Sequence, residues 1–101
     1  MEAIQVTCYS DAPNAVILQT PGREFPGMVF QGDSLRILFR KAERAIQSFD
    51  SGNFPEARDY LSEIAETLQE RLEHYEQVLK HHGIRLPYVG PVSGNSPAQS
   101  D

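Results

Sequence analysis

The 101-residue chain has a single cysteine, no tryptophan and fewer basic than acidic residues. Because Cys8 is alone, no intrachain disulfide can hold the chain together. Nine lysines and arginines against fourteen acidic residues give a net charge of −5. Binding of duplex nucleic acid needs a clustered excess of positive charge, so the composition argues against a nucleic acid partner.

The sequence also lacks long apolar runs. Its apolar stretches fall far short of the roughly 20 residues that a membrane-spanning helix needs, so we expect no membrane partner. The opening residues MEAIQVTCYS lack the basic and apolar regions that are typical of a secretory signal. Together with the lone cysteine, this favours a cytoplasmic location.

Motifs for catalysis and cofactor binding are missing as well. The chain has neither a GxxxxGK[ST] nor a GxGxxG phosphate loop, and no HExxH or CxxC spacing supports a metal site at His74 and His81. The histidines are far along the chain from Cys8 and Ser34, so no activated nucleophile is indicated. We expect a non-enzymatic protein without cofactor or metal.

Hydrophobic periodicity predicts an α+β fold, in which a three-stranded antiparallel β-meander is followed by a long antiparallel helical hairpin. The first strand alternates between apolar and polar residues, as half-buried strands do. Ile4, Val6 and Cys8 fall on its apolar side, which predicts an inert core thiol. We expect strands at about 3–10, 15–20 and 28–31, and helices at about 34–50 and 53–82.

In both predicted helices, apolar residues recur in steps of three and four, which is the pattern of an amphipathic helix. Asp33 or Ser34 is a suitable N-cap for the first helix. Asn53, followed three residues later by Glu56, resembles a capping box at the start of the second.

The length of the chain supports one domain, which we assign to residues 1–90. Its last part, residues 84–89, carries apolar side chains that can pack against the body of the domain. Pro, Gly, Ser, Asn and Gln dominate from Pro91 onward, and this composition predicts a disordered tail over residues 91–101.

The segment PGREFPG, residues 21–27, places Arg23 between two corners that each contain proline and glycine. Glycine tolerates the positive φ that tight turns require, so we interpret the segment as a rigid turn. Arg23 has no evident packing role. It can pair with Asp33 or Glu24, or it can contact a partner, and we count it as a candidate binding residue.

Five acidic residues of the second predicted helix recur at intervals of four, three, four and three: Asp59, Glu63, Glu66, Glu70 and Glu73. This spacing puts them on one side of the helix, away from the apolar stripe. Such a ridge is typical of a solvated face that pairs in part with basic residues of the first helix. It also suits docking of a basic protein, so these five residues are candidate partner-binding residues.

The motif PGREFPG, followed by a short strand and QGDSL, resembles that of a family of small uncharacterised bacterial proteins with the pattern PGRxFPGxxxQGDSL. The resemblance covers residues 5–40 and implies no activity. Small size and acidic charge are also similar to the profile of bacterial immunity proteins. That profile implies a protein that neutralises a cognate toxin, such as a basic toxin domain, by direct binding.

Two other functions remain open at this point. The second helix is long and its apolar stripe is wider than one partner helix needs, which suits a homodimer acting as a structural or adaptor module. The corner around Arg23 suits a small ligand-binding domain.

Overall fold

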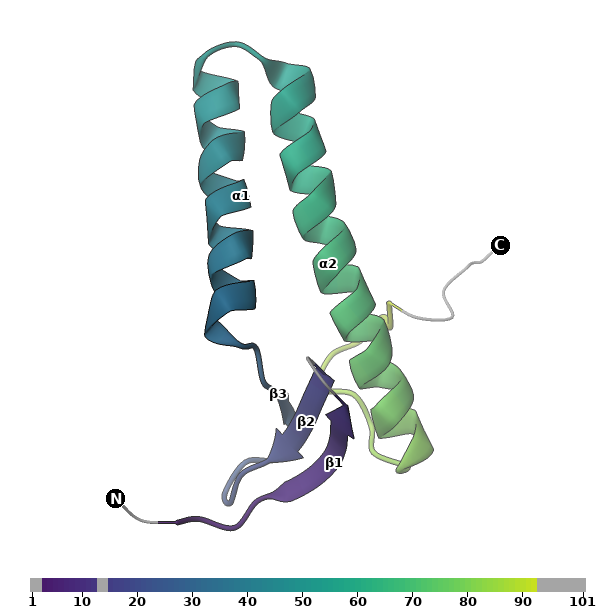
Figure 1. Cartoon of the computed structure of the whole chain (residues 1–101). Helices are drawn as coiled ribbons and strands as arrows, with labels where there is room; N and C mark the ends of the chain where they lie inside the picture. Colours follow the sequence, from purple (N-terminus) through teal and green to yellow (C-terminus); the bar gives the residue numbers. More distant parts are fainter. Residues whose placement is uncertain (1–2, 13–14, 93–101) are drawn as a thin grey trace. The chain divides into compact units, whose positions relative to one another are not determined.

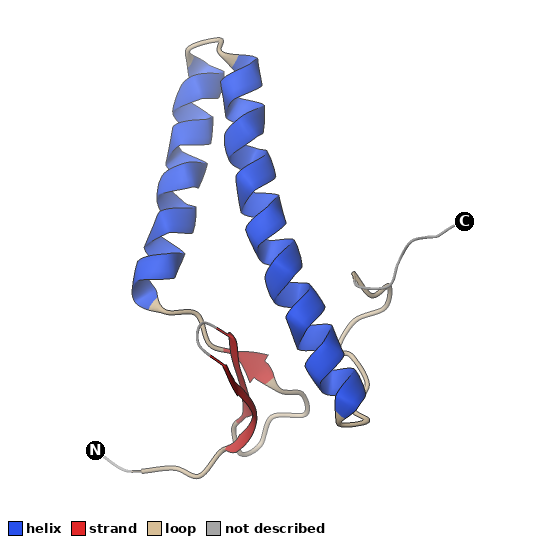
Figure 2. Cartoon of the chain, turned by 45° about the vertical axis from the view of Figure 1, so that its right-hand side comes forward, coloured by secondary structure: helices blue, strands red, loops and turns tan. Residues whose placement is uncertain are grey.

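The structure, a computed structural model, describes residues 3–12 and 15–92 and confirms the α+β fold (Figure 1). An antiparallel sheet precedes two helices, and Figure 2 separates the two kinds of element by colour. The elements are β1 (Thr7–Ala12), β2 (Ala15–Gln19), β3 (Gly27–Met28), α1 (Gly32–Asp50) and α2 (Phe54–His81).

The chain divides into two compact units. Residues 31–70 form one, the hairpin unit, in which α1 and the first part of α2 run antiparallel. The sheet unit consists of residues 1–30 and 71–101 and includes the last part of α2. The predicted disordered tail lies outside the described residues from position 93 onward.

The sheet has the order β1-β2-β3, with antiparallel neighbours throughout. The pairing of β1 with β2 is irregular between Cys8 and Ser10. β3 is shorter than predicted, and its Met28 pairs with Ile17 in the central strand. The three strands are therefore confirmed as a meander, but the third contributes only two residues.

The predicted inward side of β1 is wrong. Ile4 and Val6 precede the strand and are exposed, and Cys8 is an exposed thiol. Tyr9 packs against the core instead. An irregular residue in a strand changes which side chains point inward, and this explains why simple alternation failed here.

The core of the sheet unit consists of Ile17, Tyr75 and Leu79, so the central strand packs against the last part of α2. Partly buried apolar side chains surround these three: Tyr9, Met28, Val78, Ile84, Leu86 and Tyr88. The prediction that residues 84–89 lie against the body is confirmed for three of these side chains, whereas Val89 is fully exposed.

The start of α1 differs from the prediction. The helix begins at Gly32, its N-cap is Gln31, and no side chain caps it. Asp33 lies within the first turn, where a negative charge is favourable because of the helix dipole. Its Oδ1 atom accepts a hydrogen bond of 2.8 Å from the Ser34 amide.

The connection between the helices follows the sequence signals more closely. Gly52 has a φ of 85°, which is the left-handed conformation that glycine tolerates best. Asn53 caps α2 as predicted, since its Oδ1 atom accepts a hydrogen bond from the Glu56 amide at 3.3 Å. The carboxylate of Glu56 does not complete a capping box, because it accepts a 2.6 Å hydrogen bond from the Ser48 hydroxyl of α1.

Candidate interaction surface

The hairpin unit has an apolar side and a polar side. An apolar groove of about 460 Å³ is lined by Ala42, Ala45, Ile46, Phe49, Asp50, Ala57 and Leu61. A polar groove of about 370 Å³ is lined by Arg44, Gln47, Ser48, Ser51, Glu56 and Tyr60. Two positions along a helix correspond to a rotation of about 200°. Ile46 and Ser48 therefore point in nearly opposite directions, and the two grooves open on opposite sides.

The large side chains on the apolar side are about half exposed, with exposed fractions of 54% to 62%: Leu35, Phe39, Ile46, Phe49, Phe54 and Leu61. The buried apolar residues within 31–70 are only Ala45 and Ala57. Small side chains are therefore the most buried ones where the helices face each other, and these six large side chains lie mostly outside that contact. Exposed apolar side chains gathered on one side of an element are typical of interaction sites.

Polar contacts join the two helices on the opposite side. The Ser48 hydroxyl donates to Glu56, and the Lys41 ammonium lies 3.1 Å from a carboxylate oxygen of Glu63. Because both contacts lie away from the apolar groove, they hold the hairpin together without covering its apolar side.

The predicted acidic residues lie along α2 but are not equivalent. Asp59, Glu66 and Glu70 are exposed and form no ion pair within the described part of the chain, whereas Glu63 pairs with Lys41. By helical spacing, the three unpaired residues Asp59, Glu66 and Glu70 lie on the side of α2 opposite Leu61 and Leu68. Glu73 is half-buried and belongs to the sheet unit.

The PGREFPG segment is a tight turn, as predicted. The Arg23 amide donates to the Thr20 carbonyl at 3.3 Å, and Gly22 has a φ of 81°. The side-chain amide of Gln19 donates to the Arg23 carbonyl at 2.6 Å. The side chain of Arg23 is exposed beside a shallow depression of about 350 Å³. Its binding role stays a prediction.

An ion pair of Arg23 with Glu24, one of the contacts that the sequence left open, does not form. The Glu24 carboxylate lies 3.1 Å from the guanidinium of Arg85, which also stacks over the Phe25 ring at 5.2 Å. The buried residue of this corner is Pro26, whose carbonyl accepts a 2.7 Å hydrogen bond from the Tyr75 hydroxyl. The turn is thus fixed to the core of the sheet unit.

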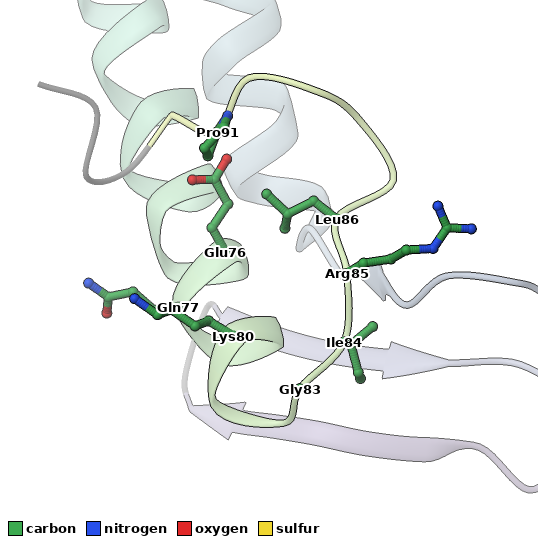
Figure 3. A pocket seen from close by; sticks show the side chains of 8 residues that line it. All are labelled: Glu76, Gln77, Lys80, Gly83, Ile84, Arg85, Leu86 and Pro91. Atoms are coloured by element: carbon green, nitrogen blue, oxygen red, sulfur yellow. The ribbon is translucent and has the colours of Figure 1, made fainter. Parts of the chain in front are cut away.

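A further pocket, of about 630 Å³, lies in the sheet unit between the end of α2 and residues 83–91 (Figure 3). Glu76, at 4% exposure, lines it. One carboxylate oxygen of Glu76 accepts hydrogen bonds from the Tyr88 hydroxyl at 2.6 Å and from the Val92 amide at 2.8 Å. These bonds attach the C-terminal segment to α2.

Burial raises the pKa of both tyrosines in this region above the ordinary value of 10.0, and Glu76 raises that of Tyr88 further. The hydroxyls of Tyr75 and Tyr88 therefore stay protonated at neutral pH and act as hydrogen-bond donors. Sequence reasoning missed Glu76, because nothing in the spacing of acidic residues separates a buried carboxylate from a solvated one.

The chain belongs to a family of unknown function, DUF6959, whose model matches residues 1–88. No curated protein and no solved structure matches it. Within the described residues, neither helix combines the length and the apolar content that crossing a bilayer requires. The family description assigns no activity.

Proposed function

We propose that this protein is a non-catalytic binding protein that acts through its helical hairpin. The observation that carries the proposal is the row of half-exposed large apolar side chains along one side of the hairpin unit. Removing apolar surface from water is favourable by about 25 cal/mol per Å². Binding of a partner to this side therefore removes apolar surface from water, which favours the complex over the isolated hairpin.

More specifically, we propose that the protein neutralises a cognate bacterial toxin in the cytoplasm by direct binding. The net charge of −5 and the exposed carboxylates of Asp59, Glu66 and Glu70 support it. An acidic surface complements a basic toxin domain and accelerates the encounter with it. Arg23, exposed on a rigid turn, supplies a second candidate contact.

Reversing Asp59, Glu66 and Glu70 to lysine is expected to slow association with a basic partner by about 10-fold or more at low ionic strength, because electrostatic steering is lost. These three residues are chosen since their replacement leaves the Lys41–Glu63 ion pair intact. The rate is measured by surface plasmon resonance, with the partner recovered on a tagged wild-type chain.

The matched control reverses Asp11, Glu24 and Glu43 to lysine, which changes the net charge by the same amount elsewhere on the chain. The exposed ion pairs of Glu24 with Arg85 and of Glu43 with Arg40 contribute little to stability. If both triple variants slow association equally, net charge rather than the α2 surface is responsible. An unchanged rate in the α2 variant contradicts its role in docking.

A further inference from the structure

We propose that a second copy of this chain covers the apolar side of the hairpin unit, so that two hairpins form a four-helix bundle. The inference rests on the proposed function, because it names the partner of that same apolar side. In four-helix bundles, apolar residues of helical hairpins meet around a common core. This hairpin provides two such helices with a shared apolar side, and the large apolar side chains on that side are exposed in the single chain.

The exposed apolar surface area on this side of the hairpin is close to the area that a stable dimer buries. Aromatic side chains bury roughly 150–250 Å², so a half-exposed one offers about 100 Å², and leucine and isoleucine offer up to about the same. The six residues Leu35, Phe39, Ile46, Phe49, Phe54 and Leu61 together offer about 600 Å² on that basis. A standard interface buries about 800 Å² per partner, so this one side supplies most of the required area.

The shape of the groove also suits another helix. The groove is lined by the small residues Ala42, Ala45 and Ala57 and by the larger Ile46 and Leu61. Packed helices insert large side chains into the spaces between side chains of the facing helix. Ile46 or Leu61 of a second copy is a side chain of the right kind to enter this groove.

The charges along the groove favour a second copy over an unrelated protein. Asp50 of α1 lines the groove, and by helical spacing Arg58 of α2 flanks Leu61 on the far rim. Neither forms an ion pair within the described part of the chain. A two-fold axis that sets α1 against α2 of the other copy brings each Asp50 near the Arg58 of its counterpart.

The position of Asp50 is unfavourable within its own helix. It occupies the last turn of α1, which holds no basic residue. A negative charge at a helix C-terminus opposes the helix dipole. An Arg58 from a second copy compensates this charge. Because both residues are near the 51–53 connection, the arrangement places the two connections at the same end of the bundle.

Self-association also leaves the acidic surface free. Asp59, Glu66 and Glu70 lie on the side of α2 opposite Leu61, so a dimer formed through the apolar side presents two such surfaces outward. Two surfaces on one particle raise the avidity for a partner that can contact both. The dimer thus adds to the proposed function without competing for its acidic residues.

Sedimentation equilibrium from about 1 μM to about 1 mM protein tests the proposal directly. Within this range a weak dimer passes from mostly dissociated to mostly associated. The wild-type chain is expected to reach twice its 11.3 kDa mass. Ile46→Glu is expected to raise the dimer dissociation constant by about 100-fold or more, since it places a charge in the centre of the interface in both copies.

Ile37→Glu is the matched control. Ile37 is on the same helix and is 56% exposed, close to the 62% of Ile46. Nine positions separate the two residues, which is about two and a half turns, so Ile37 lies on the opposite side of the helix from Ile46 and points away from the groove. Its substitution is expected to leave the dissociation constant unchanged. A wild-type monomer over the whole range, or an equal effect of both variants, overturns the proposal.

A charge exchange tests the arrangement of the copies. Asp50→Lys and Arg58→Glu are each expected to raise the dissociation constant by about 10-fold, because each puts like charges together twice. The double variant is expected to restore it. Each substitution places a charge that suits its own helix end, so the hairpin stays folded. Failure of the double variant to restore the dimer overturns the pairing of α1 with α2.

The outcome also separates this inference from the proposed function. A wild-type monomer that binds an unlike protein, and loses it on Ile46→Glu substitution, overturns self-association but keeps the binding function. A wild-type monomer that binds no protein at all overturns both.

Discussion

Replacing Leu79 with alanine is expected to lower the free energy of unfolding of the sheet unit by about 3 kcal/mol, within the range of about 2–5 kcal/mol found for buried leucines. Leu79 is fully buried and packs with Ile17 and Tyr75 in the core. The substitution removes apolar contacts and leaves a cavity that fixed neighbours cannot fill. Urea denaturation followed by circular dichroism measures the loss.

Leu61→Ala is the control for this experiment, because Leu61 is on the same helix but 57% exposed. In dilute protein it is expected to cost less than about 1 kcal/mol, as exposed sites do. In concentrated protein its cost is expected to grow, because the proposed dimer buries Leu61. Equal losses for both variants in dilute protein would show that Leu61 is packed within the single chain.

Replacing Glu76 with alanine is expected to release the C-terminal segment from α2. The change removes the acceptor of the Tyr88 hydroxyl and of the Val92 amide, both of which bond to a carboxylate that is 4% exposed. Hydrogen bonds to a charged group contribute about 1.5–3 kcal/mol each, and a buried donor left without a partner adds a further penalty. The exchange rate of the Val92 amide, read by hydrogen–deuterium exchange, should rise at least about 10-fold.

Gln77→Ala supplies the control, since Gln77 is adjacent, exposed and lines the same pocket. It is expected to leave the exchange of the Val92 amide unchanged. Unchanged exchange in the Glu76 variant would mean that apolar contacts of Ile84, Leu86 and Tyr88 hold the segment by themselves.

The sequence predicted the order and type of the elements because their signals are local. The change from alternation to a period of 3.6 near Asp33, and the glycine and asparagine between the helices, depend on residues that are close along the chain. The turn at PGREFPG is also local, since proline and glycine set its backbone. These predictions are confirmed.

Predictions about which side chains are buried were less successful, because burial depends on distant parts of the chain. An apolar stripe shows that a helix has an apolar side, but not whether this chain encloses it. Ile46 and Phe49 belong to the apolar stripe of α1, yet they are more than half exposed. The same limit placed Cys8 in the core, where an irregularity in β1 brings Tyr9 instead.

The acidic residues also show the difference between what local sequence predicts and what depends on distant contacts. Spacing along one helix correctly grouped Asp59, Glu66 and Glu70 on one exposed side. It did not distinguish them from Glu63, which pairs with Lys41 of α1, or from the buried Glu76. Those differences arise from contacts with the other helix and with the C-terminal segment, and a one-helix pattern does not contain them.

We propose that another protein chain covers the apolar side of the hairpin in the cell. Native mass spectrometry of a tagged chain, isolated gently from its native host, tests this most directly. We expect a particle with two copies of the chain, alone or together with a basic polypeptide. A single copy at 11.3 kDa, with no other polypeptide attached, would contradict it.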